Sequence, residues 1–235
     1  MRFIDAYDVI LLDQGKTFMF ENDRFGPQED YADTYRRVGG TALSPTQIRD
    51  TVEHVYSTLL KAYRDRYCDD DFPTVKDVIK TQDPSFPSVE ADYIDDVIAE
   101  HEIGTISDSH RSAIHLLADT HQLGIISNIW GQPSRFEHNL QQAGILGCFE
   151  HIVWSSAYRK SKPSRELFKA ALDYWTIEPC RILYVGNDPI RDIEIAKAVR
   201  MGAAWIDLGS ERRPAVEPDT TIHDLAELSR VMKQT

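Results

Sequence analysis

The sequence is poor in cysteine and contains no long hydrophobic run. Its three cysteines, Cys68, Cys148 and Cys180, are scattered and lack the spacing of metal ligands. This usage is typical of a reducing compartment and predicts buried structural thiols. No apolar segment is long enough to cross a bilayer, and Asp5 and Asp8 stand where a signal peptide would need its apolar stretch. We therefore expect a cytoplasmic protein that is not associated with a membrane.

Positive charge is scarce as well. The chain has 26 lysines and arginines against 38 aspartates and glutamates, a net charge of −12. Nucleic acid backbones and anionic membranes both require a basic footprint, so the charge argues against either as a partner. A local basic pocket for a small anionic metabolite is compatible with it. The composition is otherwise that of an ordinary globular protein, and 235 residues suffice for one large domain or a core with an insertion. No feature of the sequence sets an oligomeric state.

Short apolar segments alternate with amphipathic ones over much of the chain. The expected strands are residues 7–12, 123–128, 152–155, 181–186 and 203–207. The expected helices among the later strands are residues 109–120, 133–143, 164–175 and 190–201. Strands and helices of these lengths, in alternation, are typical of right-handed crossovers and a parallel sheet. The sequence therefore predicts an α/β fold.

The stretch between the first strand and the others is helical in pattern, from about residue 28 to residue 101. Its clearest helix begins with a capping box at residues 44–47, Ser-Pro-Thr-Gln, and residues 73–82 and 88–101 are shorter candidates. No convincing strand appears there. We interpret residues 18–105 as an all-helical insertion over the site, and residues 1–17 with 106–235 as the α/β core.

Chemically distinctive residues follow four of the expected strands. They are Asp13 after the first, Ser127 and Asn128 after the second, Lys162 after the third, and Asn187, Asp188 and Asp192 after the fourth. The carboxyl ends of parallel strands form one edge of a sheet, where ligands bind. The tripeptide at residues 15–17, Gly-Lys-Thr, resembles the end of a P-loop, but Ile10 stands where that loop needs a glycine and no helical pattern follows Thr17.

This set of residues is what phosphoryl transfer to a carboxylate requires. Asp13 would attack phosphorus and form an aspartyl-phosphate that water then hydrolyses. A carboxylate and a phosphate repel by roughly 4 kcal/mol per charge pair at 4 Å and an effective dielectric near 20. Mg²⁺, which prefers oxygen ligands, removes that penalty, and Asn187 and Asp188 offer such oxygens. Lys162 and Ser127 would bind the transferring phosphoryl oxygens.

The chain resembles the haloacid dehalogenase superfamily, in particular its phosphatase-like members with a helical cap inserted after the first motif. Residues 13–17 match the first motif, with Asp13 as nucleophile and Thr17 as its threonine. The second motif matches Ser127-Asn128, the third Lys162, and the fourth residues 186–192, with Asp192 as its distal aspartate. The resemblance implies a Rossmann-like three-layer core with an inserted all-α cap. It also implies a Mg²⁺-dependent phosphomonoesterase that acts on a small phosphorylated or otherwise anionic metabolite, with Asp13, the Gly15 carbonyl, Asn187 and Asp188 as metal ligands.

Two positions depart from the phosphatase pattern. The residue two after the nucleophile is an aspartate in the family's phosphatases, where it is the general acid and base, and here it is Gly15. The glycine carbonyl can still reach a metal, but no side chain can transfer a proton, so we expect slow turnover unless Glu21 or Asp23 substitutes. The fourth motif usually begins Gly-Asp, and here Asn187 takes the aspartate's place, so that either Asn187 or Asp188 is the metal ligand.

Other interpretations stay open at this stage. One is a catalytically impaired family member that binds a ligand or a protein partner, and another is hydrolysis of a carbon–halogen or carbon–phosphorus bond by the same nucleophile. The carbon–phosphorus chemistry would need a lysine from the cap, and Lys61 has an outward, polar setting. Trp130 either lines the site or packs in the core. Arg24 is the candidate for a cap residue that meets the substrate.

Overall fold

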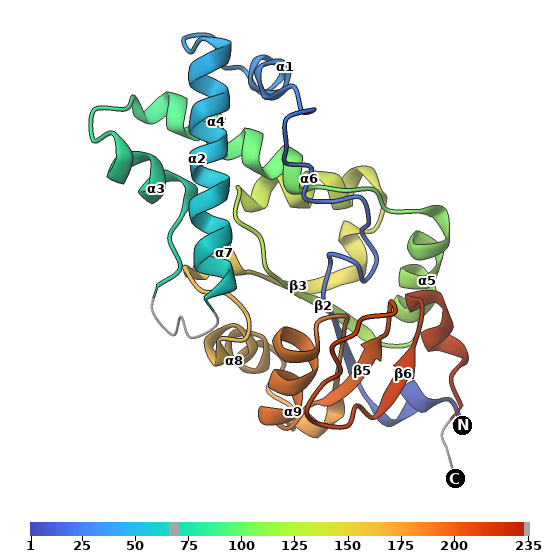
Figure 1. The fold of residues 1–235 in the computed structure, drawn as a ribbon. Helices are drawn as coiled ribbons and strands as arrows, with labels where there is room; N and C mark the ends of the chain where they lie inside the picture. Colours follow the sequence, from blue (N-terminus) through green and yellow to red (C-terminus); the bar gives the residue numbers. More distant parts are fainter. Residues whose placement is uncertain (66–70, 233–235) are drawn as a thin grey trace.

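A six-stranded, all-parallel sheet forms the centre of the molecule in the computed structural model, which describes residues 1–65 and 71–232 (Figure 1). The strand order is β3 (Phe149–Trp154), β2 (Gln122–Ser127), β1 (Val9–Leu12), β4 (Ile182–Gly186), β5 (Gly202–Ile206) and β6 (Thr220–Ile222). The first strand in sequence is thus central and pairs with β2 and β4. The predicted α/β class is confirmed.

The sheet is covered on both faces, which explains why its strands are continuous apolar runs. Ile10 and Leu12 of β1 pack in an apolar cluster with α5 (Asp108–Ala118), α6 (Pro133–Gln142) and η5 (Leu225–Arg230). Val9 and Leu11 point the other way, toward α8 (Arg165–Trp175) and α9 (Ile195–Ala198). The alternation of side chains along one strand therefore builds three layers.

No helix of the described residues is long and apolar enough to cross a membrane.

Four helices between β1 and α5 form a separate group to one side of the sheet (Figure 1). They are α1 (Tyr31–Arg37), α2 (Pro45–Arg64), α3 (Val75–Gln82) and α4 (Ser88–Glu102), and they share an apolar cluster of their own. The predicted capping box is present at the start of α2, where Ser44 accepts a hydrogen bond from the backbone N–H of Gln47 and the Gln47 side chain accepts one from Ser44. Local sequence thus sets where the longest helix begins.

The two chain segments that lead into and out of this helical group pair with each other. Phe20 and Thr105 form an isolated antiparallel bridge, with N–H to carbonyl distances of 2.9 and 2.7 Å. Gly104 permits the approach, since a Cβ atom there would lie 2.1 Å from the carbonyl oxygen of Phe20. Both ends of the helical group are therefore fastened at one place beside the sheet.

The structure differs from the sequence-based expectations in four places. The three-residue strand β6 was not expected, because it is too short to show a period. The helix expected over residues 190–201 is instead a π-helical turn, η4 (Pro189–Glu194), followed by α9. The helix after Lys162 begins only at Arg165, so Pro163 precedes its N-cap. Cys148 is half-buried and Cys180 is exposed, so the prediction of buried thiols is wrong for these two, and Cys68 lies outside the described residues.

A buried carboxyl group in α4 works against the stability of the helical group. Asp95 is 7% exposed, its Oδ1 has no hydrogen-bond partner among the described residues, and the Lys76 Nζ atom is 4.0 Å from its Oδ2. Desolvation raises its pKa to about 7, although Lys76 opposes the rise. The folded protein thus holds a proton up to about pH 7 that the unfolded chain releases near the ordinary value of 3.8. Stability therefore falls as the pH rises between these two values.

We predict that Asp95→Asn stabilises the protein above pH 7, by on the order of 1–3 kcal/mol, and has a much smaller effect at pH 4.5. Urea unfolding of wild type and variant at the two pH values measures the difference. Asp92→Asn is the matched control on the same helix, because Asp92 is exposed in its ion pair with Lys76. A gain that is the same at both pH values would contradict the titration of Asp95.

Candidate active site

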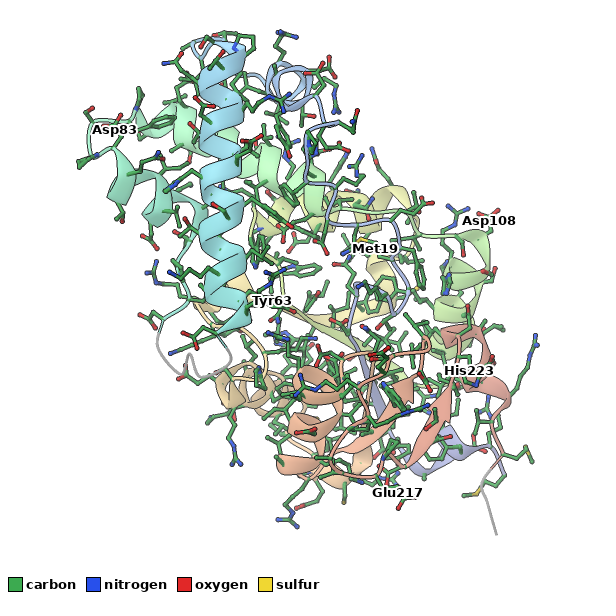
Figure 2. All side chains as sticks on the ribbon, viewed as in Figure 1. Met19, Tyr63, Asp83, Asp108, Glu217 and His223 are labelled. Atoms are coloured by element: carbon green, nitrogen blue, oxygen red, sulfur yellow. The ribbon has the colours of Figure 1, made fainter. Side chains whose placement is uncertain are left out.

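A cavity of about 310 Å³ opens at the carboxyl ends of the strands, between the sheet and α2. From the core it is lined by Asp13, Gly15, Lys16, Ser127, Asn128, Trp130, Lys162, Asn187, Asp188, Arg191 and Asp192, and from the helical group and its connections by Asn22, Asp23, Tyr56, Leu60, Tyr63 and Glu102. Figure 2 shows Tyr63 at the end of α2 that faces the core, with Asp83 at the far side of the helical group. The predicted residues after four strands therefore share one cavity, with Thr17 as the exception.

Lys162 joins the two predicted aspartates of the core. Its Nζ atom donates to Oδ1 of Asp13 at 2.7 Å and to Oδ1 of Asp192 at 2.6 Å, and its side chain is 3% exposed. Asn128 fixes the loop that carries Lys162, because its Oδ1 accepts a hydrogen bond of 2.8 Å from the Lys162 backbone N–H. Residues from three strand ends are thus tied into one buried ionic group.

Tyr184 completes this group, and sequence reasoning missed it. It lies in β4, where the alternation of side chains directs it to the α8 face of the sheet. Its hydroxyl accepts from Lys162 Nζ at 2.9 Å and donates to the carbonyl of Ile126 at 2.9 Å. All three N–H bonds of the lysine are therefore used. A tyrosine inside an apolar strand is ordinary core material by pattern, so no signal in the sequence set it apart.

Burial and charge act in opposite directions on the two ends of the Lys162–Asp13 pair. Burial, together with the charge of Asp192, raises the pKa of Asp13 to about 6, although Lys162 opposes the rise. For Lys162, burial alone would lower the pKa, but attraction to Asp13 and Asp192 outweighs it and holds the pKa well above its usual value. The lysine is therefore a permanent cation, and the Asp13 carboxylate is ionised above about pH 6.

The loop after β4 is built around two aspartates with different partners. Asp192 is 1% exposed, and its Oδ2 accepts a hydrogen bond of 2.8 Å from the backbone N–H of Asp188. Gly186 allows this arrangement, since a Cβ atom there would lie 2.5 Å from the Asp192 carboxylate. Asp188 caps η4, and its Oδ1 accepts from the N–H groups of Ile190 and Arg191 at 2.9 and 2.8 Å. Asp188 is therefore ionised and fixed in direction.

Four oxygen-bearing groups expected to hold a metal face the same cavity: Asp13, Gly15, Asn187 and Asp188. Two are carboxylates and two are neutral oxygens, a donor set that suits a hard cation such as Mg²⁺. Within the described ranges, no group of three or more histidine, cysteine, aspartate or glutamate side chains is arranged to hold a metal ion. The set therefore suits a hard, oxygen-preferring cation such as Mg²⁺, with water completing the coordination.

Aromatic side chains form the wall opposite the carboxylates. Tyr56 and Tyr63 of α2 lie with their ring centroids 5.8 and 6.1 Å from that of Trp130, which follows β2. Arg191 extends from η4 over the Tyr63 ring at 3.9 Å and donates to the Tyr63 carbonyl at 2.5 Å. Trp130 therefore lines the site while it packs with the helical group. Arg191 stands immediately before the predicted Asp192, but its contacts are visible only in three dimensions.

Glu102, at the end of α4, is a second residue that the sequence did not reveal. Its carboxylate accepts hydrogen bonds from the backbone N–H groups of Trp130, at 2.9 and 3.0 Å, and of Gly131, at 2.7 Å. Desolvation raises its pKa well above the usual range, opposed by these N–H groups and assisted by the charge of Asp23. Glu102 thus fastens the loop after β2 to the helical group.

Several candidates lie away from the cavity. Thr17 is fully buried, and its hydroxyl has no hydrogen-bond partner among the described residues. Arg24, expected to meet the substrate, instead donates to the carbonyls of Glu100 and Ile103 at the end of α4, at 2.6 and 3.3 Å, so that expectation is wrong. Lys61 is exposed, which agrees with its polar setting.

Comparison with known proteins places this chain in a family. Residues 34–206 match the haloacid dehalogenase-like hydrolases, and the chain belongs to that family. A 2-haloacid dehalogenase from Pseudomonas syringae pv. Tomato has a similar structure, with a TM-score of 0.65 and 18% identity over 95% of this chain and 97% of that one. At this identity the likeness shows the shared fold, and it confirms the predicted core with a helical insertion.

Two curated relatives are phosphatases. A phosphoserine phosphatase of Thermus thermophilus is 29% identical over 107 residues, which are 45% of this chain and 42% of that protein. A glyceraldehyde 3-phosphate phosphatase of Pyrococcus furiosus is 25% identical over 147 residues, 59% of this chain and 60% of that protein. This chain thus spans about half the length of the curated relatives that it matches.

The central role of Lys162 leads to a stability prediction. Lys162→Met leaves Asp13 and Asp192 buried as like charges without a counterion, a loss of about 3–5 kcal/mol at pH 8. The loss should be smaller at pH 5, because a carboxyl whose folded-state pKa is raised takes up a proton as the pH falls, and protonation relieves the repulsion. Thermal unfolding at the two pH values measures it.

Lys169→Met on α8 is the control for this prediction, because Lys169 is exposed and pairs only with Asp173 on the same helix in the described structure. A small loss in both variants, independent of pH, would show that the ionic group does not hold the core together.

Proposed function

We propose that this protein is a Mg²⁺-dependent phosphomonoesterase that acts on a small phosphorylated metabolite through an aspartyl-phosphate on Asp13. The observation that carries the proposal is the buried Lys162, which holds the Asp13 carboxylate at the edge of a cavity lined by further oxygen ligands. The relatives named as phosphatases support it, as does a cavity of about 310 Å³, which has room for a small metabolite only.

In the proposed reaction Asp13 attacks phosphorus, the bond from phosphorus to the leaving oxygen breaks, and water later hydrolyses the acyl phosphate. Lys162 holds the attacking carboxylate in place and neutralises part of the charge of the phosphoryl group. Ser127, which is 2% exposed at the end of β2, offers its hydroxyl to a phosphoryl oxygen. Asn128 acts as a positioning residue through its bond to the Lys162 backbone.

The metal would be held by Asp13, the Gly15 carbonyl, Asn187 and Asp188. A bound Mg²⁺ supplies electrostatic relief of the repulsion between carboxylate and phosphate. Asp188 is limited to its Oδ2 for this purpose, since its Oδ1 accepts two N–H groups of η4. Arg191 lies 3.4 Å from that Oδ2 and holds the carboxylate in direction. The buried Asp192 acts on the metal site only through Lys162 and the Asp188 N–H.

The helical group of residues 18–105 serves in this proposal as a cap that selects the substrate. Tyr56, Leu60 and Tyr63 of α2 supply its part of the wall, and no arginine or lysine of the described part of the cap lines the cavity. The part of the leaving group that meets the cap is therefore expected to be compact and partly apolar, while Lys16 and Arg191 line the cavity from the core.

The nucleophile is tested by Asp13→Asn. The variant should lose phosphate release from p-nitrophenyl phosphate by at least about 10³-fold, because an amide does not attack phosphorus. Asp8→Asn is the control, since Asp8 stands just before the same strand at its opposite end and pairs with Arg181. Equal activity of the two variants would overturn the assignment of Asp13.

The metal is tested by chelation. EDTA should abolish activity and added Mg²⁺ should restore it, and Asn187→Ala should raise the Mg²⁺ concentration for half-maximal activity by about 10-fold or more. Calorimetric titration of Mg²⁺ provides the same comparison without turnover. Gln141→Ala, an exposed amide on α6, is the control. Full activity in EDTA would exclude the proposed metal dependence.

Carbon–halogen hydrolysis is the second candidate, and one observation favours it. A halide leaves as an anion without a proton, so Gly15 is no handicap, and the apolar side chains Leu60 and Trp130 suit a short alkyl chain. Chloride release from 2-chloropropionate in EDTA, lost in Asp13→Asn, would identify this activity instead. If the intact wild-type protein shows neither activity, both hydrolytic candidates are contradicted for these substrates.

A further inference from the structure

Gly15 has no side chain to serve as the general acid that the proposed phosphomonoesterase needs. The residues around Gly15 indicate which other carboxyl group could take that role. A Cβ atom built on Gly15 would lie 3.4 Å from Nδ2 of Asn22, an ordinary contact distance. A side chain at position 15 would thus extend toward Asn22. Asn22 lies in the first connection to the helical group and lines the cavity.

Asn22 is hydrogen-bonded to the carboxylate of the next residue. Its Nδ2 donates to Oδ2 of Asp23 at 2.8 Å, and Asp23 lines the same cavity as Asp13. Asp23 has a φ of 59°, in the left-handed region that aspartate and asparagine tolerate best among residues with a side chain. Its backbone N–H donates to the carbonyl of Glu102 at 3.4 Å, next to the Phe20–Thr105 bridge. The segment that carries Asp23 is therefore fastened to the exit of the cap.

The other carboxylates of the cavity are already engaged. Asp192 binds Lys162 and the Asp188 N–H, Asp188 binds two N–H groups of η4, and Glu102 binds the N–H groups of Trp130 and Gly131. These are strong donors that hold each group in its place. Asp23 receives one hydrogen bond in the described structure, from a neutral amide, and it is exposed where it lines the cavity.

Glu21, the other carboxylate considered from the sequence, is turned away. It accepts a hydrogen bond of 3.0 Å from the Thr105 hydroxyl, is exposed, and does not line the cavity. Although the residue is exposed, the protein around its carboxyl partly desolvates Asp23 and raises its pKa, and the charge of Lys16 opposes the rise. The Glu102 carboxyl is near enough for the charge of Asp23 to act on it. The direction of the shift favours the protonated form of the carboxyl, which a general acid needs.

We propose that Asp23, presented by the cap entry segment beside Gly15, is the general acid and base of the reaction. The inference rests on the proposed phosphatase function. In the first step Asp13 bonds to phosphorus, the electron pair of the breaking bond goes to the leaving oxygen, and the Asp23 carboxyl gives that oxygen its proton. In the second step the Asp23 carboxylate takes a proton from water as the water oxygen bonds to phosphorus. Asp13 then leaves phosphorus as a carboxylate and inorganic phosphate is released. The Asp23 carboxyl is again protonated and ready for the next cycle.

The test compares two substrates in the full chain with Mg²⁺. Asp23→Asn should lower kcat for glycerol 2-phosphate by about 10²–10⁴-fold, because an alkoxide leaves poorly without a proton. With p-nitrophenyl phosphate, whose leaving group needs no proton, the variant should release a burst of about one nitrophenol per site and then turn over slowly, since the second step lacks its base. Asparagine suits the left-handed backbone at position 23, so the variant should fold.

Two further variants sharpen the test. Gly15→Asp in the Asp23→Asn protein should restore hydrolysis of glycerol 2-phosphate, because it places a carboxyl group within reach of Asn22 in the same cavity. Glu21→Gln, two residues from Asp23 and outside the cavity, should behave as wild type. A merely structural role for Asp23 predicts equal losses on both substrates, no burst and no rescue, and that result would overturn the inference.

The outcome also separates this inference from the function on which it rests. If Asp23→Asn hydrolyses both substrates at the wild-type rate and Asp13→Asn does not, the phosphatase function stands and the role of Asp23 is refuted. If wild type shows no Asp13-dependent phosphate release, the proposed function fails first. If Gly15→Asp raises the activity of the wild-type protein and Asp23→Asn leaves it unchanged, the general acid acts only from position 15, and Asp23 does not replace it.

Discussion

The ammonium group of Lys162, buried between two carboxylates, is the interaction on which the edge of the sheet at the cavity depends. Asp13, Asp192 and Lys162 come from three strand ends, and like charges of the two aspartates cannot share a buried place without a cation between them. The Tyr184 hydroxyl accepts the remaining N–H of the lysine and donates to a backbone carbonyl of β2. The group therefore joins three strand ends and fixes the position of the Asp13 carboxylate.

The helical group meets this edge through contacts of a different kind. The Phe20–Thr105 bridge fastens its two connections, Glu102 binds the loop after β2, and Arg191 reaches from the core over the Tyr63 ring. Glu102 and Arg191 line the cavity, and Ala99 of α4 packs in the apolar cluster that contains Ile10 and Leu12. These contacts fix the helical group relative to the edge of the sheet that carries Asp13.

Carboxyl groups of one cavity differ in their chemistry because their partners differ. Asp192 and Asp188 receive a cation or backbone N–H groups and are held in place, while Asp13 is buried enough to have a pKa of about 6 despite its lysine. Asp23 receives a single amide hydrogen bond. Environment thus gives carboxyl groups of one cavity different pKa values and different partners, and the roles proposed for Asp13 and Asp23 rest on this difference.

The sequence by itself determined the α/β class, the five longer strands to within three residues, the capping box of α2, and the position of Asp13 and Lys162 after strands of one sheet. Periodicity and capping are local, and parallel strands bring their carboxyl ends together whatever else the chain does. Only the tertiary structure decided that Tyr184 and Glu102 join the site, that Arg24 caps a helix instead, and that Asn22 lies beside Gly15. Those outcomes depend on contacts between residues far apart in the chain, and such contacts leave no period or spacing in the sequence.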